Sequence, residues 1–533
     1  MARTKILAKN YRRPTIYMLG VHALRASQAI RFLAVGLLLL IVTASAWGQN
    51  AATLAFVDVN VIPMDTERVL SRHTVLVQGD RIVSIEPSDS AIIPKGAQRI
   101  SAKGQYLIPG LIDVHSNLLS DKYIADEYAD EELAVIVANG VLTIRDPIGK
   151  PELLVYRDQI ENGELFGPSL YVGSPQLAGV GYGSAANSRM VATPFEAAAA
   201  VREFEAAGYD FIKLTFGITA DIYEGIVLTA RGRLPVIGDV GPDIGLGRAL
   251  ESAQQIEHLD QYLEALMDEA TPRAKGLSGV GVWVVENWAE IEKLDIRRIE
   301  TVVRATVESE IWNTPTLAFL NASFGTGRSD EEIEASSDYG FVSPSVREEL
   351  LRDRDRFWSN PPEESFRTRY VELRNRIVAG LYRAGGKLMA GSYSPEGLFL
   401  PGFALHRELE SLVSAGLPPF AALWAATRSP ATFLSWGGGG RTEYARVDSE
   451  GIRFETATTV DIDFGRIAVG KRADLVLLGA NPLDDIRNTT LIEGVVLRGR
   501  WVQRDELDAI LERSAEVLSG APLLPGLQEQ ERR

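Results

Sequence analysis

A histidine and an asparagine two residues apart, His115 and Asn117, are the side chains best placed for chemistry in the first part of the chain. They follow the apolar run 107–112, which contains Pro109 and Gly110 and predicts a buried strand. Residues two apart on a strand share a face, so both side chains can meet at the strand's carboxyl end. Imidazole binds divalent transition metals well, whereas an amide oxygen binds them weakly. The pair therefore offers one good metal ligand and one poor one.

The 533-residue chain contains no cysteine. This excludes thiolate zinc sites and a cysteine nucleophile, so a metal would have to be held by histidine, carboxylate or modified lysine. The hydrophobic content of 46% is that of an ordinary globular protein. The formal net charge of −16, without a basic run, argues against nucleic acid or an anionic membrane surface as a partner.

The elements that must position these residues fall into two groups. Both ends of the chain contain short strand patterns, at 53–62, 74–77, 81–85, 471–478 and 494–501. Strand-rich ends around a mixed middle predict a small β-sandwich domain built from both chain ends, residues 49–108 and 464–503.

Residues 109–435 alternate short apolar strands with helical segments. Strands are expected at 140–146, 211–214 and 235–239, with helices at 194–207 and 247–253. This alternation predicts an α/β fold with a parallel sheet, a (β/α)8 TIM barrel. Within and after it we expect a helical insertion at 328–385, a flexible insertion at 436–463, and a C-terminal helix and tail at 504–533.

The segment from Pro109 to His115 resembles the entry strand of the amidohydrolase superfamily, whose pattern reads P-G-L-I-D-x-H-x-H. Three further phrases match that family: G-x-D-F-I-K at 208–213, I-E-H at 256–258 and G-K-R-A-D-L-V-L-L at 470–478. The resemblance runs from about residue 53 to 502 and is closest to the imidazolonepropionase- and prolidase-like branch. It implies the barrel, the sandwich from both chain ends, and metal-dependent hydrolysis of C–N bonds.

In that family six residues at the ends of five barrel strands hold the metal centre. They are two histidines, a carboxylated lysine or glutamate, two more histidines and an aspartate that also transfers protons. The corresponding residues here are His115, Asn117, Lys213, Asp239, His258 and Tyr393. Asn117, Asp239 and Tyr393 depart from the family pattern. The resemblance therefore implies at most one zinc ion, held among His115, Lys213, Asp239 and His258, or no metal.

Two interpretations of Lys213 remain open. A carboxylated Lys213 could hold one zinc ion together with Asp239 and His258, leaving the fourth position to water. An unmodified Lys213 would instead pair with Asp239 and fill the metal space. We prefer this ion pair, because a buried ammonium without a partner is costly.

Tyr393 is the substitution with the largest expected effect on catalysis. A phenol with an ordinary pKa near 10 is a poor general base at neutral pH, so Tyr393 would serve as a hydrogen-bond donor. Metal-free catalysis through Tyr393 and Lys213 is a third option.

Two other features are given structural roles: Arg145 and Asp146 in the phrase T-x-R-D should fix a loop, and His406 should pack within a helix.

Residues 1–48 have the pattern of an export signal. Arg25 and Arg31 precede the apolar run 32–42, and residues 44–46 form a small-residue cleavage site. The run is shorter than the roughly 20 residues that span a bilayer. We expect a periplasmic or secreted protein that leaves the membrane after cleavage, with an uncleaved anchor as the alternative and Met18 as an alternative start.

The sequence thus predicts an exported hydrolase of C–N bonds in a cyclic amide or short peptide. Because its metal site is degenerate, we expect its activity to be weak or lost. The alternative is an inactive pseudoenzyme that binds a small ligand or a protein partner. The sequence does not identify the substrate, and it leaves the formation of a homo-oligomer open.

Overall fold

The computed structural model describes residues 53–119, 126–181, 187–267, 288–396, 399–435, 441–448, 451–458 and 462–521. The predicted signal, residues 1–48, lies outside this part of the chain. Among the described helices, none has the length and apolar content of a membrane span.

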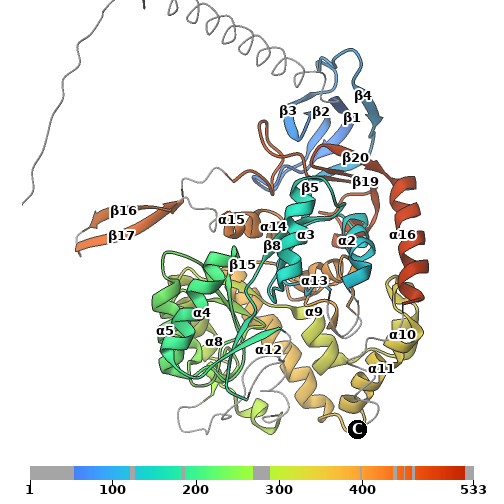
Figure 1. The fold of residues 1–533 in the computed structure, drawn as a ribbon. Helices are drawn as coiled ribbons and strands as arrows, with labels where there is room; N and C mark the ends of the chain where they lie inside the picture. The colour runs from blue at the N-terminus through green and yellow to red at the C-terminus, as the bar shows by residue number, and fades with distance from the viewer. Residues whose placement is uncertain are drawn as a thin grey trace, which may run out of the picture. The chain divides into compact units, whose positions relative to one another are not determined.

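Strands from both ends of the chain form one eight-stranded sheet (Figure 1). Its members are β1 (Thr53–Val61), β2 (Leu70–Gln78), β3 (Arg81–Pro87), β4 (Gln98–Ser101), β5 (Tyr106–Pro109), β18 (Leu475–Leu478), β19 (Ile492–Leu497) and β20 (Arg500–Gln503). The two ends are joined where β18 pairs antiparallel with β5, in the register Val476 to Ile108. The predicted union of the chain ends is therefore present, whereas the division into a two-sheet sandwich stays a prediction.

The middle of the chain is an α/β region with two parallel sheets. The first sheet contains β6 (Leu111–Asp113), β7 (Val141–Asp146) and β8 (Ser169–Val172). The second contains β9 (Gln176–Gly179), β10 (Ser188–Val191), β11 (Ile212–Leu214), β12 (Val236–Gly238), β13 (Gln255–Glu257), β14 (Trp312–Thr314) and β15 (Lys387–Leu388). The strands expected at 140–146, 211–214 and 235–239 are β7, β11 and β12.

Backbone pairs connect the two parallel sheets at both ends. Gly173, after β8, pairs with Phe211, and Ser116, after β6, pairs with Ser394, after β15. The eight strands β6–β8 and β11–β15 thus follow one another as in a TIM-barrel-like fold. A closed barrel stays a prediction.

Helices alternate with these strands, as the sequence pattern predicts. They are α2 (Ala129–Ala138), α3 (Pro151–Glu161), α4 (Pro194–Ala207), α5 (Ala220–Ala230), α6 (Gly245–Glu251), α8 (Arg298–Glu308), α9 (Leu317–Leu320), α13 (Phe403–Ser414), α14 (Pro419–Ala425) and α15 (Arg428–Leu434). Helix α4 has the residues that were expected, because Thr193 caps its amino end, Pro194 occupies its first turn and the left-handed Gly208 ends it.

The remaining elements lie in the expected insertions and at the C-terminus. Within 328–385 the structure has α10 (Asp330–Glu334), α11 (Pro344–Trp358) and α12 (Glu364–Arg383), which confirms helical structure there. Within 436–463 it has an antiparallel hairpin, β16 (Arg441–Asp448) and β17 (Gly451–Thr458). Helix α16 (Arg504–Ser519) follows the last strand.

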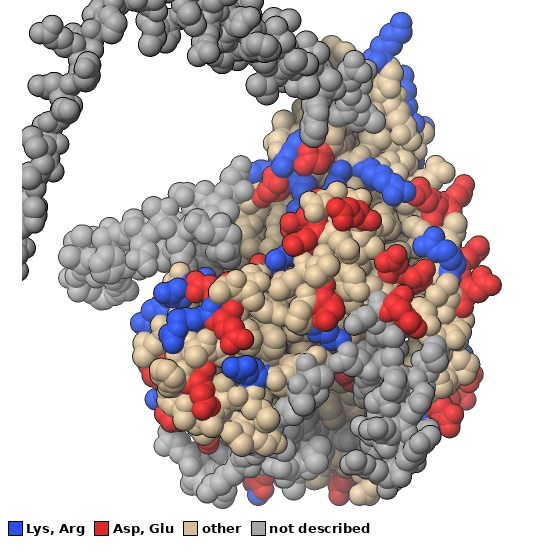
Figure 2. Space-filling view, in the orientation of Figure 1, with Lys and Arg blue, Asp and Glu red and all other residues tan. Residues whose placement is uncertain are grey.

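Charged side chains of both signs are intermixed over the face of the molecule in Figure 2. The exposed charges include local ion pairs, such as that of Arg233 with Glu205 at 2.8 Å. Exposed pairs of this kind contribute little to stability.

Candidate functional site

The predicted site residues follow the carboxyl ends of parallel strands. His115 comes after β6, Asp239 after β12, His258 after β13 and Tyr393 after β15, while Lys213 lies within β11. Short backbone hydrogen bonds hold these ends together, including 2.7 Å from the Tyr393 N–H to the His115 carbonyl. The fold thus brings residues far apart in the sequence to one edge of the sheet, where catalytic groups of such folds lie.

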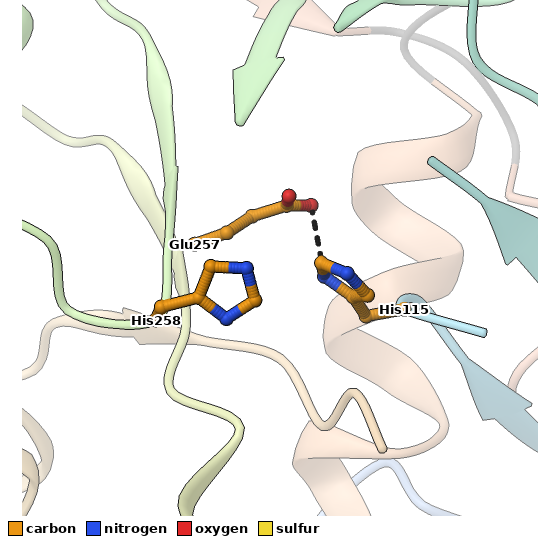
Figure 3. A group of neighbouring side chains, drawn as sticks. All are labelled: His115, Glu257 and His258. Carbon is orange, nitrogen blue, oxygen red and sulfur yellow. Dashed lines mark ion pairs between the residues drawn. The ribbon is translucent and has the colours of Figure 1, made fainter. Parts of the chain in front are cut away.

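Three buried side chains at this edge form a potential metal-binding group. His115, Glu257 and His258 each offer one ligand atom, and these atoms all lie within 4.8 Å of one another. Figure 3 shows Glu257 reaching toward His115, with His115 Nδ1 and Glu257 Oε1 3.3 Å apart. Two imidazoles and one carboxylate are a suitable ligand set for one divalent ion.

Lys213 is not left without a partner. Its ammonium donates a hydrogen bond to Oε2 of Glu257, and its Nζ also lies 3.6 Å from Oδ1 of Asp239. Burial lowers the pKa of Lys213, but the two carboxylates outweigh burial and raise it above its ordinary value. Lys213 is therefore an ammonium at neutral pH. Carboxylation of a lysine requires the neutral amine, so this protonation state opposes it.

A second buried cation, Arg145 of β7, contacts the same glutamate. Its guanidinium donates to Oε1 of Glu257 and, over 2.9 Å, to Oε1 of Gln255. Burial raises the pKa of Glu257, while the charges around it lower the pKa well below its ordinary value. Since burial keeps His115 neutral, the cations that matter here are Lys213 and Arg145.

The two histidines are neutral at neutral pH. Burial lowers the pKa of His115 to about 4 and lowers that of His258 well below its ordinary value. The centroids of their rings are 4.8 Å apart. The Tyr393 ring packs against both, with its centroid 4.8 Å from that of His115 and 4.7 Å from that of His258. Burial raises the pKa of Tyr393 well above 10, so its phenol stays protonated and does not act as a base.

Asp239 lies between Lys213 and His258. Its Oδ1 is 3.7 Å from Nε2 of His258, and its Oδ2 accepts a hydrogen bond of 3.0 Å from Thr215. Burial raises the pKa of Asp239, and Lys213 opposes that change. The predicted pairing of Lys213 with Asp239 is thus present, but Glu257 is the nearer partner of the lysine.

Asn117, the poor ligand of the predicted set, contacts the segment after β15. Its backbone N–H donates to the Ser394 carbonyl over 2.8 Å, and its Oδ1 is buried without a hydrogen-bond partner. The described residues therefore bring together His115, Lys213, Asp239, His258 and Tyr393. Their catalytic or metal-binding roles stay predictions.

The sequence analysis missed Glu257 and the central position of Arg145. Both lie inside phrases that were recognised, I-E-H and T-x-R-D, and both alternate along a strand with apolar residues. Glu257 and Gln255 share a face of β13, so two polar residues at a spacing of two were the available signal.

Asp146 and His406, which were given structural roles together with Arg145, have the roles that were expected, whereas Arg145 lies at the centre of the site. Asp146 accepts hydrogen bonds from the N–H groups of Leu118 and Ile148, at 2.6 and 2.7 Å, which confirms its role in fixing a loop. His406 is buried in α13, with its Nδ1 2.9 Å from Thr489 Oγ1 and its Nε2 3.0 Å from the Asn139 carbonyl. Its packing role is confirmed.

The backbone at the site is strained. His258, Thr316 and Tyr393 have φ values of 61°, 47° and 58°, in the left-handed region that side chains rarely adopt. Such conformations persist where the surrounding structure imposes them, and they cluster at functional sites.

Comparisons with solved structures place this geometry in a known fold. No family model and no curated protein matches the chain. Bottromycin amidohydrolase has a TM-score of 0.63 and 21% identity over 87% of this chain and 90% of its own. A protein assigned as a prolidase from Bifidobacterium longum has a TM-score of 0.59 and 22% identity, over 87% of this chain and 99% of its own. Molinate hydrolase has a TM-score of 0.56 and 17% identity, over 89% of this chain and 97% of its own.

These similarities extend over most of each chain at low sequence identity, so they establish the fold. The chain has the fold of the amidohydrolase superfamily, as the sequence phrases predicted.

Proposed function

We propose that this chain is an exported protein of the amidohydrolase fold that binds a cyclic amide or short peptide at the carboxyl ends of its parallel strands. Its metal-dependent hydrolysis of C–N bonds is weak or lost. The observation that carries the proposal is the position of Glu257, which pairs with Lys213 and Arg145 where a metal centre would need free ligands.

The charges of the site balance without a metal. Lys213 and Arg145 are positive, and Glu257 and Asp239 are negative, so the buried group is neutral when all four are ionised. A divalent ion would add two uncompensated charges in a buried place, which is costly. Carboxylation of Lys213 would change its charge from +1 to −1 and offset them. Carboxylation of Lys213 would therefore favour metal binding in this site.

The protonated phenol of Tyr393 also argues against efficient hydrolysis. A general base is typically worth about 10² to 10⁴ in rate, and this phenol does not supply one. The comparison proteins support the ligand class, since they include an amidohydrolase and a protein assigned as a prolidase. We therefore propose an amide-containing ligand.

A second candidate is a hydrolase with a single zinc ion. The proximity of His115, Glu257 and His258 favours it, because these ligand atoms lie within reach of one ion. When bound, zinc would polarise a carbonyl and activate water. To hold zinc, Glu257 would have to give up its ion pair with Lys213 or with Arg145.

Metal analysis of the purified full-length protein separates the two candidates. We expect less than about 0.1 zinc per chain, no change of Tm in chelator, and binding of the dipeptide Ala-Pro or of hydantoin without turnover. Near one zinc per chain, lost in His258→Ala, together with hydrolysis of either compound, would establish the hydrolase instead. Lys293→Met serves as a control, because Lys293 is exposed and pairs with Glu290 at the surface.

Metal-free catalysis through Lys213 and Tyr393 is tested in the same assay. Turnover that survives chelator but disappears in Lys213→Ala would support it. The raised pKa of Lys213 keeps the side chain as an ammonium, which has no lone pair for nucleophilic attack, so we expect no such activity.

Export is a separate part of the proposal. It is supported by the sequence pattern of residues 1–48, with its arginines, apolar run and small residues. Amino-terminal sequencing of the protein recovered from the periplasm or medium should give a start near residue 49. An intact amino terminus in the membrane fraction would support the anchor.

A further inference from the structure

Four hydrogen bonds form a closed ring around His258. Arg374 of α12 donates from Nη1 to the His258 carbonyl over 2.8 Å and from Nη2 to the Pro315 carbonyl over 2.9 Å. The Thr316 hydroxyl donates to the same Pro315 carbonyl over 2.9 Å. Nδ1 of the His258 ring lies 2.9 Å from Oγ1 of Thr316 and completes the ring.

The direction of these bonds determines which nitrogen of His258 carries the proton. A threonine hydroxyl has one hydrogen, and that of Thr316 is directed to the Pro315 carbonyl. In this arrangement its oxygen accepts a hydrogen bond from Nδ1–H of His258. In a neutral imidazole the other nitrogen, Nε2, keeps its lone pair. The nearest oxygen of Asp239, Oδ1, lies 3.7 Å from that atom, which is too far for a hydrogen bond, so Asp239 does not hold a proton on Nε2.

Arg374 explains how the strained backbone here is maintained. His258 and Thr316 both have left-handed backbone conformations. Arg374 binds the carbonyl of His258 itself and the carbonyl of Pro315, which forms the peptide bond to Thr316. The guanidinium is buried, and its rigid fork joins the ends of β13 and β14. A lysine has a single ammonium on a flexible stem and does not reproduce this bidentate contact.

We infer that Arg374 and Thr316 are positioning residues that hold His258 with its proton on Nδ1, so that Nε2 accepts a hydrogen bond from an N–H group of the ligand. The part concerning the ligand rests on the proposed function. The part concerning the proton position does not, since it describes the free protein.

Long-range proton–nitrogen NMR spectra of the full chain with labelled histidine test the first part. The His258 signals are assigned by their loss in His258→Gln. We expect the Nδ1–H form in the wild type and in Thr316→Ser, which keeps the hydroxyl. Thr316→Val, which has nearly the same shape but no hydroxyl, should change the pattern to Nε2–H or to a mixture.

The arginine is tested with a matched pair on the same helix. Arg374→Lys should lose the pure Nδ1–H pattern, while Arg376→Lys should keep it, because Arg376 is half exposed and pairs with Glu372 at the surface. An Nε2–H pattern in the wild type, or an unchanged pattern in both Thr316→Val and Arg374→Lys, would overturn the inference. Thr316→Val and Thr316→Ser keep the test valid if Arg374→Lys fails to fold.

The ligand part is tested with two cyclic amides that differ only in their N–H groups. Hydantoin should bind more tightly than 1,3-dimethylhydantoin, and Thr316→Val should weaken hydantoin binding by about tenfold, the effect of one hydrogen bond. Equal binding of both compounds would overturn this part. If neither binds, the proposed function fails for cyclic amides, while the proton position of His258 is decided by the spectra alone.

Discussion

The ammonium of Lys213 and the carboxylate of Glu257 form an ion pair inside the parallel sheet, and both side chains are almost fully buried. The lysine belongs to β11 and the glutamate to β13, so the pair spans β12 between them. Burying two charges is favourable only when each finds a partner of opposite sign. The pair therefore makes this part of the molecule sensitive to the loss of either residue.

Replacing Lys213 with methionine should destabilise the protein by about 3 kcal/mol, because Asp239 loses its cation and Glu257 keeps only Arg145. Methionine is chosen since it fills much of the same space without charge. Urea denaturation of wild type and variant gives the difference in the free energy of unfolding. Lys293→Met, at an exposed position, should change it by no more than about 0.5 kcal/mol. Equal effects of the two substitutions would show that the buried pair contributes nothing.

Restoring the three substituted ligands should restore metal binding. The variant with Asn117→His, Asp239→His and Tyr393→Asp gains two imidazoles and a carboxylate, which bind zinc better than an amide and a phenol do. Removing the Asp239 carboxylate also removes the largest contribution that raises the pKa of Lys213, which favours its carboxylation.

After equilibration with zinc and bicarbonate, we expect this variant to hold between one and two zinc ions per chain by mass spectrometry. The wild type, treated identically, should hold far less. The same triple change with Lys213→Met is the control, since it removes the residue that would bridge two ions. A metal content no higher than that of the wild type would contradict the view that these substitutions disabled the site.

The fold was largely predictable because its signals are local. Apolar runs with a period of two, helix starts at Pro194 and Pro419, and the glycine after α4 each act within a few residues. The union of the chain ends could be predicted from their strand patterns, but not the pairing of β5 with β18, because nothing local relates Ile108 to Val476.

The site was predictable as a set of positions but not as a set of contacts. Lys213 was expected to pair with Asp239, yet Glu257 is the nearer partner, because side chains on different strands meet in three dimensions. Arg145 was assigned to a loop since its neighbour Asp146 has that role. The ring through Arg374 was not predicted, because α12 lies within the insertion 328–385, to which no role at the site was assigned.

Acid should destabilise the protein partly through His406. Burial lowers the pKa of this residue to about 4 in the folded state, against about 6.5 when unfolded, so the unfolded chain binds more protons between these values. The stability that its neutral form contributes is complete above about pH 6.5 and is lost as the pH falls toward 4. At about pH 5 the loss amounts to roughly 2 kcal/mol.

Urea denaturation at about pH 7.5 and about pH 5 measures this contribution. In His406→Gln the decrease between the two pH values should be smaller than in the wild type by roughly 2 kcal/mol. Gly340→Ala, which meets no atom within 4 Å and changes no titratable group, is the control and should show the wild-type decrease. If His406→Gln shows the full wild-type decrease, the buried ring does not titrate as inferred.

The close approach of β15 to β6 is tested by Gly391→Ala. A Cβ atom at this position would lie 2.5 Å from Cγ2 of Thr314 and 2.7 Å from Cβ of His115, and neither short side chain can move aside without its backbone. Overpacking of this kind typically costs 1–3 kcal/mol, so we expect a loss of about 2 kcal/mol in urea denaturation. Gly340→Ala meets no atom within 4 Å and should have almost no effect. A loss in Gly391→Ala no larger than that in Gly340→Ala would mean that these two strand ends are farther apart in solution, and that His115 and Tyr393 do not share one site.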